Sequence, residues 1–106
     1  MPKFTNVSID PKANIYFDGK VTSHAIILSD KTEKTIGLLY PGEYHFGTGA
    51  AELMEIIGGE CNVLIDGTTE SLSIEAGQSF EIAGNSGFTI TVKDCICEYV
   101  CSYLPA

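Results

Sequence analysis

The sequence lacks arginine and tryptophan altogether, and its six basic residues, all lysines, face 14 acidic ones. The resulting net charge of −8 disfavours a nucleic-acid backbone or an anionic membrane surface as a partner, which leaves small molecules and proteins. Because there is no guanidinium group, any phosphate site must be built from lysine, histidine, hydroxyl groups or backbone N–H groups.

Long apolar stretches are also missing. No window approaches the roughly 18 consecutive apolar residues of a membrane span, and the amino-terminal MPKFTNVSIDPKAN has no apolar run of signal-peptide length. The cysteines, Cys61, Cys95, Cys97 and Cys101, lack the paired C-x2-C spacing of structural zinc sites and are interpreted as reduced, mostly structural thiols. We therefore expect a cytoplasmic protein.

What the sequence does contain is a regular succession of turn signals. At 106 residues the chain is long enough for one domain with a real core. Residues 1–14 hold two prolines and few large apolar groups, which predicts a loose leader before a domain spanning residues 15–106. Turn pairs then recur at Asp18-Gly19, Pro41-Gly42, Gly58-Gly59, Asp66-Gly67, Ala76-Gly77 and Gly84-Asn85.

The segments between these turns are short and rich in β-branched and aromatic residues, which predicts strands. They are VTSHAIILS, KTIGLLY, EYHFG, CNVLID, ESLSIE, QSFEIA, GFTITVK and CICEYVCSYL. About nine short strands without a clear helix indicate an all-β sandwich or barrel. The most definite hairpin is NVLIDGTTESLSI, where Asp66-Gly67 supplies the residues preferred in a two-residue primed turn.

The segment AAELMEII is composed of good helix formers, so intrinsic propensity alone favours a helix. It is short for a stable helix and ordinary in length for a strand, and its β context favours a strand. As a strand, it places Glu52, Met54 and Ile56 on one face.

The terminal segment from Cys95 to Leu104 alternates cysteine and tyrosine on one side with mostly apolar residues on the other. Two largely apolar faces on a terminal strand imply burial on both. We therefore expect a subunit interface here, in its simplest form a homodimer.

Residues 41–60, PGEYHFGTGAAELMEIIGGE, have the outline of the first signature of the cupin barrels: Pro-Gly, a strand with a histidine, a glutamate and a Gly turn. Mononuclear cupin sites use three histidines and a carboxylate. This chain has only His24 and His45, and none between Asn85 and Phe88, where a second signature supplies its last histidine. The outline predicts an all-β, single-domain cupin-type jelly-roll β-barrel without a metal.

Five stretches together carry a more specific resemblance. They are YFDGKVTS, GEYHFGT with its G-x-Y-x-F-x-T pattern, AAELMEIIGG, AGQSFEIAGNSGF and the closing YVCSYL. In this order and at this spacing, over residues 15–104, they resemble the pyrimidine/purine nucleoside phosphorylase family of small bacterial cupins. The chain departs from the family in a longer leader and in Ala83, where members often have a different residue.

The resemblance implies a metal-independent enzyme without a cofactor. Such an enzyme splits purine and pyrimidine nucleosides, with inorganic phosphate as co-substrate, into the free base and ribose 1-phosphate. Phosphorolysis passes through a cation-like sugar, which an anion stabilises, so Glu52 is the first catalytic candidate. His45 is the second, as an acid or a phosphate ligand.

Substrate-binding candidates complete the predicted site. Lys20 in the matched DGKV stretch and the Thr48 hydroxyl are candidates for phosphate, together with backbone amides near Gly47 and Gly49. Tyr44 and Phe46 offer π faces that accept purines and pyrimidines alike, because a site that hydrogen-bonds one base edge rejects the other class. Met54 lies on the same strand face as Glu52 and is expected to line the same site.

Three alternatives stay open at this stage. Tyr44, Phe46 and Thr48 face inward in the favoured register of their strand, whereas a one-residue slip would instead bring His45 inward. A non-catalytic ligand-binding or interaction module fits the same composition, because fold does not fix function. A metal-dependent cupin enzyme is the third alternative, and the missing histidines speak against it.

Overall fold

The computed structural model describes residues 3–105 and contains strands with one short 3-10 turn. The strands are β1 (Ser8–Ile9), β2 (Asn14–Tyr16), β3 (Val21–Ile27), β4 (Glu33–Leu39), β5 (Gly42–Gly47), β6 (Glu52–Gly58), β7 (Glu60–Ile65), β8 (Leu72–Glu75), β9 (Ser79–Ile82), β10 (Gly87–Val92) and β11 (Cys97–Tyr103). The 3-10 turn, η1 (Phe17–Gly19), separates β2 from β3. The all-β prediction is confirmed.

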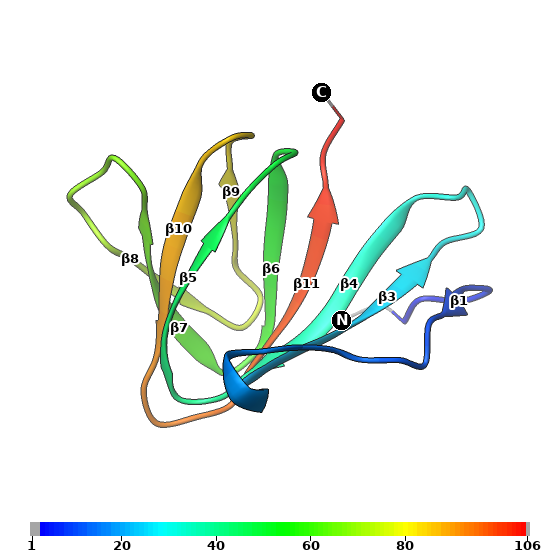
Figure 1. The fold of residues 1–106 in the computed structure, drawn as a ribbon, viewed down its shortest axis with the longest axis horizontal. Helices are drawn as coiled ribbons and strands as arrows, with labels where there is room; N and C mark the ends of the chain where they lie inside the picture. The colour runs from blue at the N-terminus through cyan, green and yellow to red at the C-terminus, as the bar shows by residue number, and fades with distance from the viewer. Residues whose placement is uncertain (1–2, 106) are drawn as a thin grey trace.

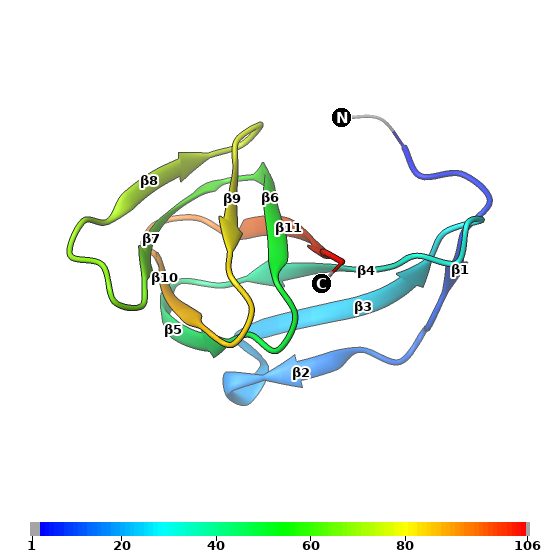
Figure 2. The same ribbon diagram turned by 90° about the horizontal axis from the view of Figure 1, so that it is seen from above.

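The strands form two antiparallel sheets that face each other (Figure 1). The large sheet has the order β1-β3-β4-β11-β6-β9, with β2 also paired to β3, and the small sheet has the order β5-β10-β7-β8. In the view from above, β5 and β10 lie opposite β6 and β11, with the interior between them (Figure 2). The sheets are not closed into one barrel, so this structure supports a two-sheet arrangement rather than the closed barrel of the prediction.

The segment predicted as a leader contributes to the large sheet. Ser8 and Ile9 of β1 pair with Ile27 and Ile26 of β3, and Asp10 N–H donates to the Ala25 carbonyl oxygen at 2.9 Å. Such pairings are distant in sequence and involve very short strands, so local composition gives no sign of them. Part of residues 3–14 therefore lies against the sheet.

The hairpin between β7 and β8 forms as predicted, but its turn differs. The paired residues end at Val63 and Leu72, so the connection is longer than a two-residue turn. Asp66 and Gly67 instead occupy a turn closed by the Thr68 N–H and the Ile65 carbonyl oxygen at 3.0 Å, and of the two central residues only Gly67 has a positive φ. A type I′ turn requires a positive φ at both.

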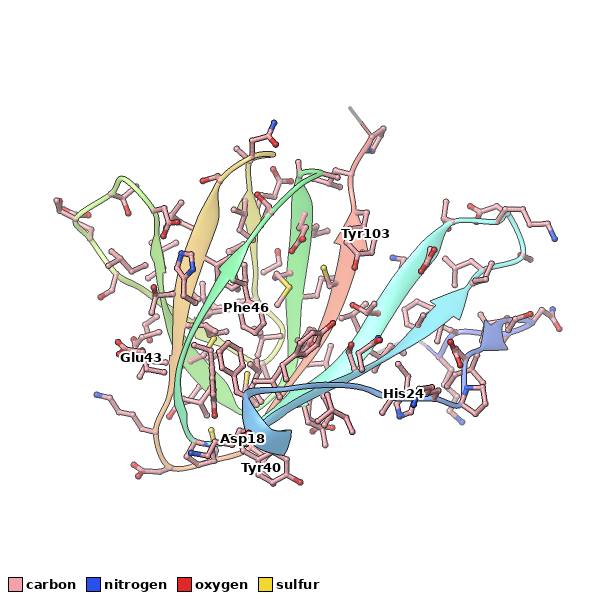
Figure 3. All side chains as sticks on the ribbon, in the orientation of Figure 1. Asp18, His24, Tyr40, Glu43, Phe46 and Tyr103 are labelled. Carbon is pink, nitrogen blue, oxygen red and sulfur yellow. The ribbon has the colours of Figure 1, made fainter. Side chains whose placement is uncertain are left out.

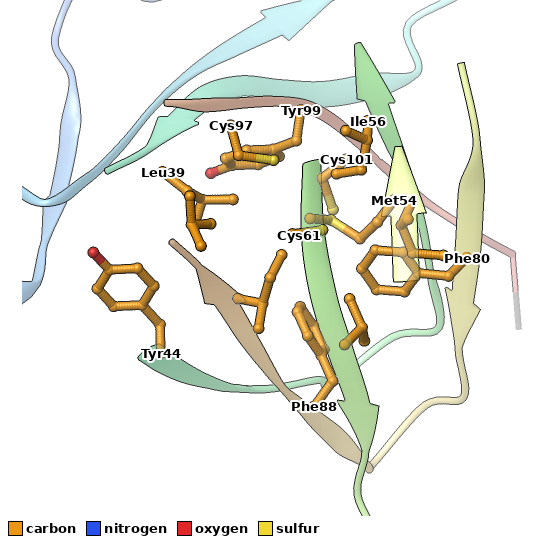
Figure 4. Packing of buried hydrophobic residues seen from close by; sticks show 14 of the residues in the cluster. Leu39, Tyr44, Met54, Ile56, Cys61, Phe80, Phe88, Cys97, Tyr99 and Cys101 are labelled. Atoms are coloured by element: carbon orange, nitrogen blue, oxygen red, sulfur yellow. The ribbon is translucent and has the colours of Figure 1, made fainter. Parts of the chain in front are cut away.

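The core fills the space between the sheets (Figure 4). It is apolar and draws on both sheets: Val21, Leu39, Tyr44, Met54, Ile56, Cys61, Val63, Ile74, Phe80, Ile82, Phe88, Ile90, Val92, Cys97, Tyr99 and Cys101. The segment AAELMEII is a strand, as predicted, and Met54 and Ile56 of β6 point into this core. Burial of this face outweighs the helix propensity of the segment.

One close approach within the large sheet depends on glycine. A Cβ atom on Gly37 of β4 would lie 2.8 Å from the Tyr99 hydroxyl oxygen and would overlap the Thr22 carbonyl oxygen. The missing side chain gives the Tyr99 ring its place against β4. Tyr99 is buried, and its hydroxyl lies 3.5 Å from the Thr22 carbonyl oxygen.

The outer face of the large sheet carries a cluster of apolar side chains. The pairing registers place Ile26, Ile36, Leu38, Leu53 and Val100 on this face, together with the charged residues Lys34, Glu55 and Glu98. Val100 is only 1% exposed, but Glu98 on the same face is exposed, so the predicted burial of both faces of the last strand is met only in part within one chain. Part of the cover is the leader, because the Lys34 ammonium lies 5.6 Å from the centroid of the Phe4 ring.

Candidate active site

The main cavity, of about 540 Å³, lies between the sheets. Its size suits a small organic ligand. Its lining residues are Asp10, Asn14, Tyr16, Ser23, Ala25, Glu33, Thr35, Leu39, Phe46, Gly47, Glu52, Met54, Phe88, Ile90, Tyr99, Cys101 and Tyr103. Three carboxylates and several hydroxyl groups line it, without a lysine or histidine from the described part of the chain.

Glu52 stands at the start of β6, on the face that points into the main cavity. Burial raises the pKa of Glu52 above the usual glutamate range, while a hydrogen bond from Cys101 opposes this shift. The Cys101 thiol lies 3.5 Å from Glu52 Oε1. Glu52 thus combines partial burial with a hydrogen-bond partner in a cavity, which is typical of a functional carboxylate.

Two residues of β11 flank Glu52. Tyr103 is its direct cross-strand partner, and Cys101 is two residues earlier on the same face. Burial is the main cause that raises the pKa of Cys101, to about 12, and the Glu52 charge adds to it. Burial also raises the pKa of Tyr103. Both groups therefore stay protonated at neutral pH, and the Cys101 thiol donates to Glu52.

Phe46 forms the aromatic wall opposite β6. Figure 3 shows its ring pointing from β5 into the space between the sheets, while Glu43 points away. The ring stacks on Phe88 at a centroid distance of 5.6 Å, and the Phe17 and Tyr16 rings lie nearly perpendicular to it at centroid distances of 5.5 and 6.4 Å. The wall is therefore a cluster of packed rings.

The predicted register of β5 is the observed one, but the inward residues have different surroundings. Tyr44 is buried in the core, its hydroxyl donates to the Tyr40 carbonyl oxygen at 2.7 Å, and it does not line the main cavity. Thr48 Oγ1 donates to the Ala83 carbonyl oxygen at 2.7 Å and accepts from the Ser86 N–H at 2.9 Å. These contacts indicate that Tyr44 and Thr48 stabilise the fold.

The remaining predicted residues divide between the cavity and the surface. Met54 lines the main cavity beside Glu52. His45 points outward from the small sheet, where its Nε2 lies 2.9 Å from Asp66 Oδ2. Lys20 is exposed and follows η1, outside the cavity lining. Glu52, Phe46 and Met54 are thus brought together, whereas His45 and Lys20 are not.

The sequence interpretation missed several cavity residues. Asp10, Asn14 and Tyr16 come from the segment at the leader boundary, and Asn14 Nδ2 donates to Ser23 Oγ at 3.3 Å. Cys101 and Tyr103 line the same cavity, although the sequence pattern favoured interface or core roles for them. The available signals were two matched stretches, YFDGKVTS with Tyr16 and Ser23 and YVCSYL with Cys101 and Tyr103, but neither gives a sign of where these side chains point.

Within residues 3–105, no group of three or more His, Cys, Asp or Glu side chains is arranged to hold a metal ion. In the same range, no helix is long and apolar enough to cross a membrane. The cysteines are free thiols, and Cys61 and Cys97 are buried.

Comparison with known proteins shows the family to which the chain belongs. A family profile described as pyrimidine/purine nucleoside phosphorylase matches residues 11–103. The chain belongs to this family. Members named pyrimidine/purine nucleoside phosphorylase from Syntrophotalea carbinolica and Hydrogenovibrio crunogenus are 49% and 48% identical to it, over 98% of this chain and 99% of each relative.

The pyrimidine/purine nucleoside phosphorylase family fold is also found in solved structures. A protein of unknown function from Acinetobacter sp. ADP1 is 41% identical, with a TM-score of 0.93 over 96% of this chain and 98% of that one. The EutQ protein of Clostridium difficile has a TM-score of 0.67 at 17% identity, over 81% of this chain and 68% of its own, which shows a shared fold alone.

Proposed function

We propose that this chain is a broad-specificity nucleoside phosphorylase. It cleaves purine and pyrimidine nucleosides with inorganic phosphate and releases the free base and ribose 1-phosphate. The observation that carries the proposal is the place of Glu52, partly buried in the main cavity of a chain that belongs to a nucleoside phosphorylase family. Both the size of the cavity and its aromatic wall suit a nucleoside.

Glu52 stabilises the sugar in this mechanism. As a phosphate oxygen bonds to C1′, the bond from C1′ to the base nitrogen breaks and its electron pair stays on the base. Water relays to the base the proton that the attacking phosphate gives up. Positive charge develops on the ribose in between, and a carboxylate already in place stabilises it. Because Glu52 acts as an anion, its raised pKa predicts loss of activity toward acidic pH.

The base binds against the wall around Phe46. An aromatic face accepts both classes of base, since it makes no hydrogen bond that one class lacks. Tyr44 is too enclosed for direct stacking, and it supports the wall through Phe17, whose ring centroid lies 5.0 Å away. Met54 provides an adaptable apolar contact beside Glu52.

Phosphate binds through neutral donors in this proposal. The hydroxyl groups of Ser23, Thr35 and Tyr103 line the cavity, as does Gly47 with its backbone. Hydroxyl and backbone N–H groups can hold an anion without a cationic side chain. The phosphate roles predicted for Lys20 and Thr48, and the roles predicted for His45, stay predictions. Their positions favour them less than the hydroxyls within the cavity.

We extend the proposal to a metal-independent reaction and to a cupin-type jelly roll. The two histidines do not line the main cavity, so the donor set there lacks the imidazoles that transition metals favour. Two facing antiparallel sheets with a cavity between them support the cupin-type assignment.

Free cysteines support a reducing compartment, the cytoplasm.

A homodimer completes the proposal. The outer face of the large sheet presents Ile36, Leu38 and Leu53 in addition to the buried Val100, and these residues are only partly covered within one chain. An apolar face of this kind pairs with its own copy around a two-fold axis.

The test is chromatographic detection of free base and ribose 1-phosphate from inosine and from uridine, with chelator, in the presence and absence of phosphate. Wild type is expected to cleave both only with phosphate, and Glu52→Gln to lose about 100-fold or more in kcat/KM. Glu43→Gln, an exposed glutamate that points away from the cavity, is the matched control. Cleavage without phosphate, or a fully active Glu52→Gln, would contradict the proposal.

A further inference from the structure

The side chain of Glu52 has one hydrogen-bond partner among the described residues, and that partner is a thiol. Cys101 Sγ lies 3.5 Å from Glu52 Oε1. Cys101 is 5% exposed and sits on the neighbouring strand, beside Met54. The contact is thus built into the pairing of β6 and β11 rather than into a loop.

The direction of this hydrogen bond is fixed by chemistry. A thiol is a weak donor, and an ionised carboxylate only accepts. The pKa of Cys101 is raised to about 12, chiefly by burial, so the sulfur keeps its proton. The thiol therefore donates to the charged carboxylate of Glu52 at neutral pH.

The other titratable groups around the cavity do little to keep Glu52 charged. They are Tyr16 from β2, Glu33 from β4, Tyr99 and Tyr103 from β11, and Asp10 after β1. Two of them are carboxylates, which disfavour a further negative charge, and the others are tyrosines, which have no cationic form to favour it. The described cavity lining brings no lysine or histidine. The hydrogen bond from Cys101 is the local contact that favours the charged form.

We propose that Cys101 is a positioning residue for Glu52: its thiol holds Oε1 and favours the ionised carboxylate, which leaves Oε2 for the ribose. The role in catalysis rests on the proposed phosphorylase function, whereas the effect on the carboxylate does not. A donor that binds the charged form lowers the pKa of an acid, so its removal raises that pKa. Its removal also frees the carboxylate to rotate.

The test begins with the carboxylate itself. Glutamate 13C-carboxyl signals are titrated by NMR in wild type, and the Glu52 signal is identified by its loss in Glu52→Gln. In Cys101→Ala the midpoint of the Glu52 titration is expected to rise, and in Cys101→Ser, which keeps a donor, it is expected to stay near wild type. Cys101→Val fills more of the same space without a donor and is expected to behave like Cys101→Ala. Cys97→Ala, a buried thiol of β11 outside the cavity lining, is the matched control.

The pH dependence of kcat/KM for inosine is the second readout. Cys101→Ala and Cys101→Val are expected to move the acidic limb to higher pH, with an about five-fold loss on that limb and a smaller loss at neutral pH. Cys101→Ser is expected to restore the wild-type profile. Melting temperatures measured alongside separate this effect from a loss of fold, because destabilisation alone does not move a pH limb and is not reversed by serine.

The outcomes separate the two proposals. An unchanged Glu52 midpoint in both Cys101→Ala and Cys101→Val would overturn this inference, even in a fully active phosphorylase. An equal rise in Cys97→Ala would overturn it too, because the effect would then be a general consequence of losing a buried thiol. A wild type that does not phosphorolyse nucleosides would overturn the proposed function, while the titration would still decide the role of Cys101.

Discussion

His45 Nε2 lies 2.9 Å from Asp66 Oδ2, on the side of the small sheet that faces away from the main cavity. The two side chains are 57% and 44% exposed, so this pair is solvated. Exposed pairs of this kind contribute at most about 1 kcal/mol to stability. The histidine of the cupin-like signature thus contacts Asp66 at the surface and does not face the main cavity.

The positions of His45 and Lys20 outside the cavity give a prediction for these two residues, which the sequence suggested as site residues. His45→Gln and Lys20→Gln are each expected to keep kcat/KM for inosine and uridine within about two-fold of wild type, because neither residue lines the cavity. Steady-state kinetics at saturating phosphate and at limiting phosphate checks this. A selective rise in the KM for phosphate in Lys20→Gln would restore the phosphate role that the sequence suggested.

Gly37 gives a prediction about stability. Gly37→Ala is expected to lower the free energy of unfolding by roughly 2 kcal/mol or more, because the new Cβ collides with the Thr22 carbonyl and the Tyr99 hydroxyl. Gly49→Ala is the matched control, since a Cβ there meets nothing within 4 Å. Urea unfolding of both variants measures the difference. Equal stabilities would show that the sheet adjusts to the methyl group without cost.

The raised pKa of Glu52 predicts a pH-dependent gain in stability when its charge is removed. In the folded state the carboxyl group holds its proton to a higher pH than in the unfolded state. The folded protein therefore binds more protons in the window between the two pKa values, and stability falls as pH rises through it.

Glu52→Gln is accordingly expected to melt higher than wild type at pH 7. Solvent around this partly exposed group screens the effect, so the gain is small, about 2 °C. The difference is expected to shrink at pH values below the ordinary glutamate range. A pH series of thermal melts tests the sign, and a variant that is less stable at pH 7 would show that the carboxylate contributes favourable contacts.

The apolar outer face of the large sheet predicts the oligomeric state. Leu38→Lys is expected to convert a dimer to a monomer in size-exclusion chromatography with light scattering, because a lysine cannot be buried there without a partner. Leu64→Lys on the small sheet is the control, as Leu64 is exposed and pairs with Thr89. A monomeric wild type at tens of micromolar would remove the proposed interface.

The fold was more accessible from the sequence than the site. Turn pairs such as Ala76-Gly77 separate strands because glycine adopts conformations that other residues avoid, and this signal is local. The inward face of β5 was predicted because it gathers the family-like residues Tyr44, Phe46 and Thr48, with a one-residue slip left open, and alternation alone did not decide it. The turn at Asp66-Gly67 was predicted less well, because the connection between β7 and β8 is longer than the two-residue turn that this pair suggests.

The walls of the cavity depend on contacts that no local pattern carries. Asp10 and Asn14 reach the cavity because β1 and β2 pair with β3, and these short strands have no recognisable period. Cys101 alternates with tyrosines just as a core residue would, and it is a core residue that also touches Glu52. Sequence reasoning found Glu52, Phe46 and Met54 but not the other residues that surround them.

The charge of the cavity lining has a consequence for the binding of phosphate. Asp10, Glu33 and Glu52 surround any ligand, and no cationic side chain from the described lining balances them. A nucleoside is uncharged and avoids this field, whereas inorganic phosphate must bind against it, held by neutral donors alone. The KM for phosphate is therefore expected to be high and to fall as added salt screens the carboxylates.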